Sequence, residues 1–240
     1  MMTLTAYIAQ LRQQHADQRV VSFTYDGETY WLKQVERTRG AMRLLKGNPK
    51  QALATEIATL RRLNQLDAPC AQLVEASDDY LVLTDVGETV NHWLNRDDMT
   101  DADKIALVAQ CASALAALHQ TGLVHGRPAL RDMGYKKGKV RFIDFESPLD
   151  QRKLERNKVR DLLVFLHDLY RSEQGSDAML NAAVSAYRQG GGEQIYQRAT
   201  ALLQRWRWLY YLLKPTRSFA GKDLLSGLQL FDYFLKKDNA

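Results

Sequence analysis

The sequence predicts an α+β protein, and two observations carry that prediction. Strand and hairpin signals dominate roughly the first hundred residues, whereas helical spacing of apolar residues recurs through almost all of the remainder. With 240 residues and 45% hydrophobic content, the chain can form one substantial domain or two small lobes. We expect a β-rich part at residues 1–88 and a mainly helical part at residues 89–240.

The first part begins with an amphipathic segment at residues 4–11, and β-branched and aromatic residues then predict a strand over residues 20–25. Asp26-Gly27 favours a type I′ hairpin turn, so residues 29–35 should return as the partner strand, which carries Lys33. Apolar spacing predicts a helix over residues 52–66, with Glu56 beside its apolar stripe. Two further strands are expected at residues 72–76 and 80–84.

The second part contains several segments with helical periodicity, at residues 103–119, 152–171, 177–188, 193–213 and 222–236. Between the first two of these, a loop is followed by a turn at Lys137-Gly138 and a strand over residues 139–145. The chain has no internal repeat and no low-complexity tract.

Bulk composition narrows the classes of function. A formal charge of +5 and a pI near 9.1 suit an acidic partner, such as a phosphorylated glycolipid, a membrane surface or nucleic acid. Cys70 and Cys111 lack the spacing of a zinc site, so we expect two buried thiols. The sequence contains neither a long apolar run nor a secretory signal, which predicts a cytoplasmic protein.

The chemistry-bearing residues gather between residues 123 and 148, in LVHGRPALRDMGYKKGKVRFIDFESP. His125-Gly126-Arg127 is followed by Asp132, and Asp144 comes after an apolar pair at the end of the predicted strand. Carboxylates at such positions can bind Mg²⁺ and so hold nucleotide phosphates. A strand lysine such as Lys33 can neutralise phosphates, and a helix carboxylate such as Glu56 can hold it in place.

The order of these parts resembles the protein-kinase-like superfamily, and in particular its compact bacterial branch, the Kdo and heptose kinases of lipopolysaccharide cores. The resemblance covers residues 18–170 and implies a two-lobed fold, with ATP and Mg²⁺ as cofactors. It also implies a hydroxyl acceptor, either a lipopolysaccharide core sugar or a protein side chain. Contact with the inner membrane surface would suit a glycolipid acceptor, and no nucleic-acid partner is expected.

The resemblance also assigns roles to single residues. Lys33 and Glu56 would bind the ATP phosphates as a pair, Asp85 and Val86 would lie in the adenine-binding hinge, and Asp144 and Asp132 would bind metal. His125 would pack and hydrogen-bond the loop, and Gly126 would allow a backbone geometry closed to other residues. Asp161 would anchor the loop backbone, and Glu146 would add a contact near the metal.

Two departures bear on activity. Arg127 stands where these kinases carry the catalytic aspartate, and a guanidinium cannot accept the acceptor's proton. The glycine-rich phosphate loop is also missing, since Gly27 is the only glycine between residues 19 and 30. Either Asp132 or Arg127 would then take a catalytic role, or the chain would be a pseudokinase, a nucleotide-binding or scaffolding module. The aromatic and basic segment at residues 205–211 is open to three interpretations: stacking, core packing or an interfacial patch.

Overall fold

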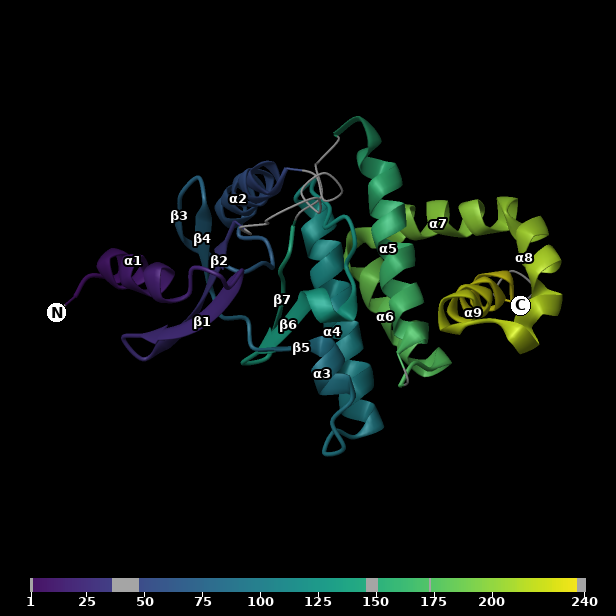
Figure 1. Ribbon diagram of the computed structural model, residues 1–240. Helices are drawn as coiled ribbons and strands as arrows, with labels where there is room; N and C mark the ends of the chain where they lie inside the picture. The colour runs from purple at the N-terminus through teal and green to yellow at the C-terminus, as the bar shows by residue number, and fades with distance from the viewer. Residues whose placement is uncertain (1, 36–47, 146–150, 173, 237–240) are drawn as a thin grey trace. The chain divides into compact units, whose positions relative to one another are not determined.

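The structure is a computed structural model that describes residues 2–35, 48–145, 151–172 and 174–236. It confirms the predicted α+β class, with small antiparallel sheets and many helices (Figure 1). The chain divides into two compact units, one of residues 1–86 and 143–148 and the other of residues 87–142 and 149–240. Glu146, for which the sequence predicted a contact near the metal, lies outside the described residues.

The first unit is built on a four-stranded antiparallel sheet with the order β1-β2-β4-β3. Its strands are β1 (Val20–Tyr25), β2 (Glu28–Gln34), β3 (Leu73–Ala76) and β4 (Tyr80–Thr84), and its helices are α1 (Leu4–Gln14) and α2 (Pro49–Gln65). Asp26 and Gly27 have positive φ angles of 51° and 78°, as the predicted hairpin turn requires.

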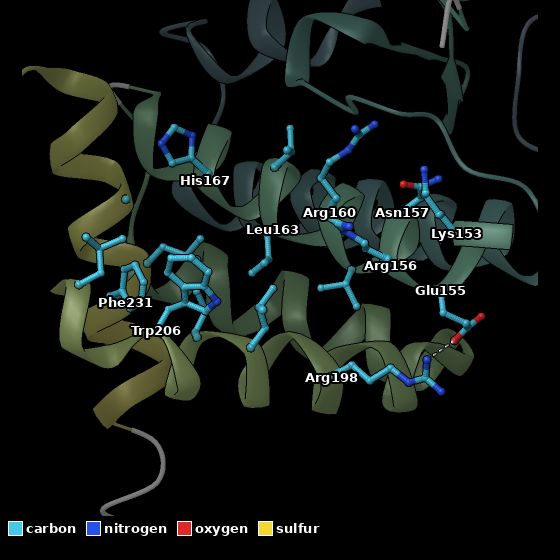
Figure 2. Close-up of a pocket in the computed structure, with 17 residues that line it drawn as sticks. Lys153, Glu155, Arg156, Asn157, Arg160, Leu163, His167, Arg198, Trp206 and Phe231 are labelled. Atoms are coloured by element: carbon cyan, nitrogen blue, oxygen red, sulfur yellow. Dashed lines mark ion pairs between the residues drawn. The ribbon is translucent and has the colours of Figure 1, made fainter. Parts of the chain in front are cut away.

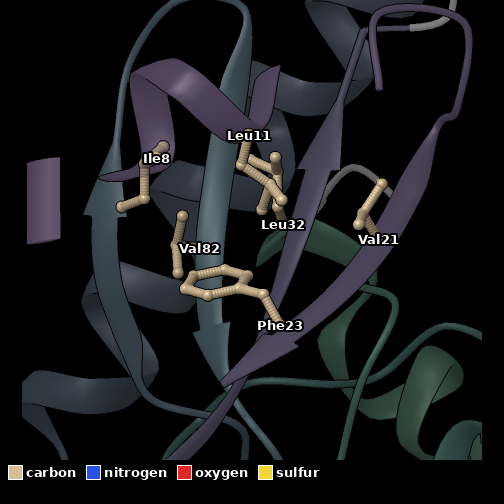
Figure 3. Close-up of a cluster of buried hydrophobic side chains, with 6 residues drawn as sticks. All are labelled: Ile8, Leu11, Val21, Phe23, Leu32 and Val82. Atoms are coloured by element: carbon tan, nitrogen blue, oxygen red, sulfur yellow. The ribbon is translucent and has the colours of Figure 1, made fainter. Parts of the chain in front are cut away.

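Helix α1 closes one face of this sheet. Ile8 and Leu11 of α1 pack with Leu32 of β2 and with three further residues of β1 and β4 (Figure 3), namely Val21, Phe23 and Val82. Helix α2 begins at Pro49. The side chain of its N-cap residue, Asn48, accepts a hydrogen bond from the backbone N–H of Lys50. Strand β4 is buried along Leu81, Val82 and Leu83 because both faces of the sheet are covered.

The second unit holds most of the helices and a three-stranded antiparallel sheet. The sheet has the order β5-β6-β7 and consists of β5 (Glu88–Thr89), β6 (Met133–Lys136) and β7 (Lys139–Phe142). The helices are α3 (Val90–Leu94), α4 (Asp101–Gln120), α5 (Leu154–Arg171), α6 (Asp177–Tyr187), α7 (Glu193–Arg205), α8 (Arg207–Leu213) and α9 (Lys222–Lys236). Shorter helical turns are η2 (Leu130–Asp132), η3 (Gln151–Lys153), η4 (Arg188–Gly192) and η5 (Lys214–Phe219).

Two expected elements differ in the structure. The strand expected over residues 139–145 ends at Phe142, because Asp144 has a φ of 70°, a left-handed conformation that cannot continue a strand. The single helix expected over residues 193–213 is broken at Trp206 into α7 and α8. The break lets α8 turn onto α9, where Tyr210 is buried and donates a hydrogen bond to Asp232.

Candidate functional site

The alternation of β2 places Lys33 on the face of the sheet opposite helix α1. Leu32 is fully buried in the cluster below α1, so the next side chain along the strand points to the other face. On that face Lys33 meets Glu56, which lies on α2 and is itself only 1% exposed. The Lys33 side chain is 11% exposed, so its ammonium group is largely desolvated.

Lys33 bridges two carboxylates of the first unit. Its Nζ lies 2.6 Å from Glu56 Oε2 and 2.8 Å from Asp144 Oδ1. Burial alone would lower the pKa of Lys33, but the Glu56 and Asp144 carboxylates outweigh burial and raise the pKa above its ordinary value. Lys33 is therefore protonated at neutral pH, and its ammonium group is held by a charge-assisted hydrogen bond to Asp144 and an ion pair with Glu56.

Asp144 differs from Glu56 in both exposure and backbone conformation. Its side chain is 48% exposed, whereas that of Glu56 is buried. Its φ of 70° is uncommon for a residue other than glycine and carries backbone strain, a feature that tends to accumulate at functional sites. Of the two carboxylates on Lys33, Asp144 is thus the one that can also reach a ligand.

In the second unit, the segment from His125 to Asp132 is anchored by a buried carboxylate. Asp161 of α5 is fully buried and accepts hydrogen bonds from the backbone N–H groups of His125, at 2.7 Å, and Gly126, at 3.0 Å. The φ of Gly126 is 98°, which explains why glycine occupies this position. The His125 ring packs against Phe142 and accepts the backbone N–H of Arg127 on Nδ1, so it holds the loop in shape.

Sequence reasoning missed two further anchors on α5. Asp168 accepts the backbone N–H of Leu130 at 2.8 Å, and Arg160 donates to the carbonyl oxygen of Gly126. Asp168 follows Asp161 by seven residues, which is two turns along the same helix face. That spacing of two aspartates on a predicted helix was the available signal.

Arg127 and Asp132, the two residues predicted to be catalytic, differ in exposure. Asp132 ends η2 and is buried, and its Oδ1 lies 3.7 Å from Arg131 Nε. Arg127 is exposed and lines a cleft of about 770 Å³ within the second unit. Basic and acidic side chains share this cleft, with Arg127, Arg131, Arg171, His167 and Lys222 facing Asp168 and Asp223.

The predicted hinge residues lie directly after β4. Asp85 accepts a hydrogen bond from the Trp31 indole at 2.8 Å, and its backbone N–H donates to the carbonyl oxygen of Thr29. Val86 is buried. The Asp85 side chain thus fixes the end of β4 to β2.

The predicted site residues fall into two groups. Lys33, Glu56 and Asp144 are in contact in the first unit, while Arg127 and Asp132 belong to the second. Among the described residues, no group of three or more His, Cys, Asp or Glu side chains is arranged to hold a metal ion by itself.

Cys70 and Cys111 are buried and form no disulfide, as predicted. Within the part of the chain that the structure describes, no helix is long and apolar enough to cross a membrane.

Comparison with known proteins first indicates a class. Over 143 residues the chain is 23% identical to the "Probable serine/threonine-protein kinase BUD32 homolog" of Archaeoglobus fulgidus, which covers 59% of this chain and 68% of that protein. This is a distant and partial similarity to the kinase-like superfamily. No protein-family model matches the chain.

A second relative is much nearer in sequence. The chain belongs to the same family as a Haemophilus influenzae protein described as uncharacterized, to which it is 39% identical over 231 residues, 96% of each chain.

Proposed function

We propose that the chain is an ATP- and Mg²⁺-dependent phosphotransferase that acts on a hydroxyl acceptor. The observation that carries this proposal is Lys33, held between the buried Glu56 and the half-exposed Asp144. A cation fixed on a strand by a buried carboxylate is the arrangement that kinases use to bind nucleotide phosphates. The distant similarity to a protein kinase homologue supports the same class of activity.

Asp144 and Asp132 are the proposed ligands of the metal. Carboxylate oxygens are the ligands that Mg²⁺ prefers. A bound Mg²⁺ would neutralise phosphate charge, and Lys33 would do the same from the strand.

In the transfer, the acceptor's hydroxyl oxygen forms a bond to the γ-phosphorus of ATP, and the bond from that phosphorus to the β,γ-bridging oxygen breaks. ADP leaves, and the hydroxyl proton passes to Asp132 or to solvent. Because this chemistry depends mainly on positioning and electrostatics, loss of the usual base lowers the rate by ~10²–10⁴-fold without abolishing it. Arg127, a cation, would stabilise charge on the transferring group or bind the acceptor.

The acceptor is proposed to carry negative charge. Arg127 and Arg131 line this cleft together with Arg171, which donates a hydrogen bond to Asp223 at 2.6 Å. Guanidinium groups recognise phosphate and carboxylate well. A phosphorylated core sugar of lipopolysaccharide suits this lining better than a neutral protein hydroxyl does. The adenine would bind backbone groups after β4, near Asp85 and Val86.

The test is a thermal-shift titration of the full chain with ATP, with and without Mg²⁺. At about a hundred times the dissociation constant, binding should stabilise the protein by ~2.7 kcal/mol, or several degrees in Tm. Lys33→Met and Asp144→Asn should abolish the Mg²⁺-dependent shift, whereas Lys139→Met, at an exposed strand lysine, should keep it. If the wild type shows no shift and the two variants behave like it, the phosphotransferase proposal is wrong.

A pseudokinase is the second candidate, and the exposed Arg127 favours it. Radiolabelled ATP offered with lipopolysaccharide, with a protein acceptor or with the chain alone separates the two candidates. Transfer of label identifies an enzyme, and nucleotide binding without transfer identifies a pseudokinase. For a slow kinase, Arg127→Asp should raise the transfer rate by restoring a base.

A further inference from the structure

Helix α8 has two apolar faces, and only one of them is covered. Tyr210 is 5% exposed and bonds to Asp232 of α9. Trp208, Tyr211 and Leu212 are 57%, 63% and 65% exposed. Their spacing of three and four residues places these three side chains on one face of the helix. That face is apolar and directed to solvent.

Two further exposed apolar residues flank α8 along the chain. Trp206, just before the helix, is 44% exposed and stacks on Trp208 with ring centroids 5.9 Å apart. Phe219, at the end of η5, is 91% exposed. We call these five residues, Trp206, Trp208, Tyr211, Leu212 and Phe219, the α8 surface. Such a concentration of exposed large apolar side chains within fourteen residues of sequence marks an interaction site.

The chain segment that contains α8 carries charge of one sign. Residues 194–222 contain six Lys and Arg residues and no Asp or Glu. Arg205, Arg207 and Lys214 are exposed among the aromatic side chains. Asp232, from α9, pairs with Arg217 at 2.8 Å. Basic residues interspersed with exposed aromatic and aliphatic ones are typical of segments that lie in the headgroup region of a membrane.

The adjoining groove repeats this combination. It lies between α5 and α7, has a volume of about 1020 Å³, and has Trp206 and Phe231 near one end (Figure 2). Its lining includes several leucines, with Arg156 and Arg160 along the α5 side and Arg198 paired with Glu155 toward the other end. A groove lined by both leucines and arginines suits amphiphiles that carry an anionic head.

We propose that the α8 surface docks the protein onto a lipid bilayer that contains anionic lipids. Leu212 distinguishes this partner from nucleic acid, because burying an exposed aliphatic side chain in the acyl boundary is favourable, whereas an aliphatic side chain can neither pair with phosphates nor stack on bases. Anionic headgroups can neutralise the Lys and Arg residues of this segment, and no individual acidic residue of a protein partner is required. The inference does not depend on the proposed phosphotransferase activity.

The experiment is co-sedimentation of the full chain with sucrose-loaded vesicles of phosphatidylcholine alone, or of phosphatidylcholine with 30% phosphatidylglycerol. The wild type should bind the anionic vesicles at low salt and release them as salt rises. Trp208→Ser with Leu212→Ser should reduce partitioning at least tenfold. Arg207→Gln with Lys214→Gln should reduce it by about 25-fold, since each cation contributes about five-fold.

Matched controls come from exposed positions in the first unit. Leu66 and Val74 are 47% and 39% exposed, and Leu66→Ser with Val74→Ser should leave partitioning unchanged. Arg61→Gln with a second substitution at the exposed Arg62, Arg62→Gln, controls for net charge. Far-UV circular dichroism checks that every variant is folded.

Three outcomes overturn the proposal. The first is a folded wild type that does not sediment with anionic vesicles at low salt. The second is an α8-surface variant that partitions as strongly as the wild type. The third is that the same variants lose binding to RNA, or lose self-association, while vesicle binding is absent or unaffected. Loss of partitioning in the α8-surface variants alone, with the controls intact, supports it.

Discussion

Removal of the Asp161 carboxylate should destabilise the second unit more than removal of any exposed carboxylate. Asp161 is fully buried and accepts the backbone N–H groups of His125 and Gly126. In Asp161→Ala both N–H groups keep their burial and lose their acceptor. A buried donor left without a partner costs about 1–3 kcal/mol, so the free energy of unfolding should fall by about 2–6 kcal/mol.

Asp161→Asn is the sharper variant because it preserves the shape of the side chain. His125 N lies 2.7 Å from Oδ2, and Gly126 N lies 3.0 Å from Oδ1 and 3.1 Å from Oδ2. An amide oxygen in the Oδ2 position can still accept from both groups, but the amide nitrogen then faces the Gly126 N–H. We expect a loss of about 1–3 kcal/mol, smaller than for the alanine variant.

The assay is urea unfolding followed by circular dichroism, combined with hydrogen exchange of the His125 and Gly126 amides. Asp97→Ala, at an exposed position of the same unit, is the control and should change stability by no more than about 0.5 kcal/mol. Exchange at the two amides should accelerate in both Asp161 variants. If Asp161→Ala unfolds within 1 kcal/mol of the wild type, or if the two amides exchange at the wild-type rate, the anchoring role is wrong.

Three further predictions follow from packing and charge. Burial lowers the pKa of His119, and Asp161 partly opposes this shift. As the pH falls, the unfolded chain therefore binds a proton on this imidazole before the folded chain does. Stability should therefore be complete above pH ~6.5 and fall below it, by up to ~1.4 kcal/mol per pH unit, and His119→Gln should remove this dependence in urea titrations. Gly227→Ala in α9 should stabilise by about 0.5–1 kcal/mol, since nothing lies near the added methyl, whereas Gly175→Ala should destabilise because its Cβ would meet a backbone oxygen at 2.1 Å. Glu56→Gln removes the buried partner of Lys33 and should cost about 3 kcal/mol in unfolding free energy, and replacing both residues by apolar ones should cost less.

Each of these has a result that contradicts it. For His119, that result is an unchanged slope of stability between pH 5 and 7 in the variant. For the glycines it is equal melting temperatures of the two alanine variants. For Glu56 it is a double apolar variant that is less stable than Glu56→Gln.

Local patterns in the sequence were sufficient for much of the secondary structure. Strand β1, the turn at Asp26-Gly27 and helix α9 were predicted at their observed positions, because alternation, turn chemistry and helical spacing act within a few residues. The extent of β7 was not, since the left-handed φ of Asp144 ends the strand before the apolar run does. Strand β6 was missed because its four residues, one of them glycine, acquire a strand's geometry only by pairing with β7.

For the candidate site, too, part was predictable from the sequence and part depended on the tertiary structure. The sequence by itself selected Lys33, Glu56 and Asp144 as candidates, from residue type, order and the expected elements. Only the tertiary structure decided that one ammonium group bridges both carboxylates, because contacts between residues more than a hundred positions apart depend on how the sheet and helix pack. Burial was decided there too: Glu56 is enclosed while Asp144 is half exposed, and sequence periodicity cannot distinguish these two environments.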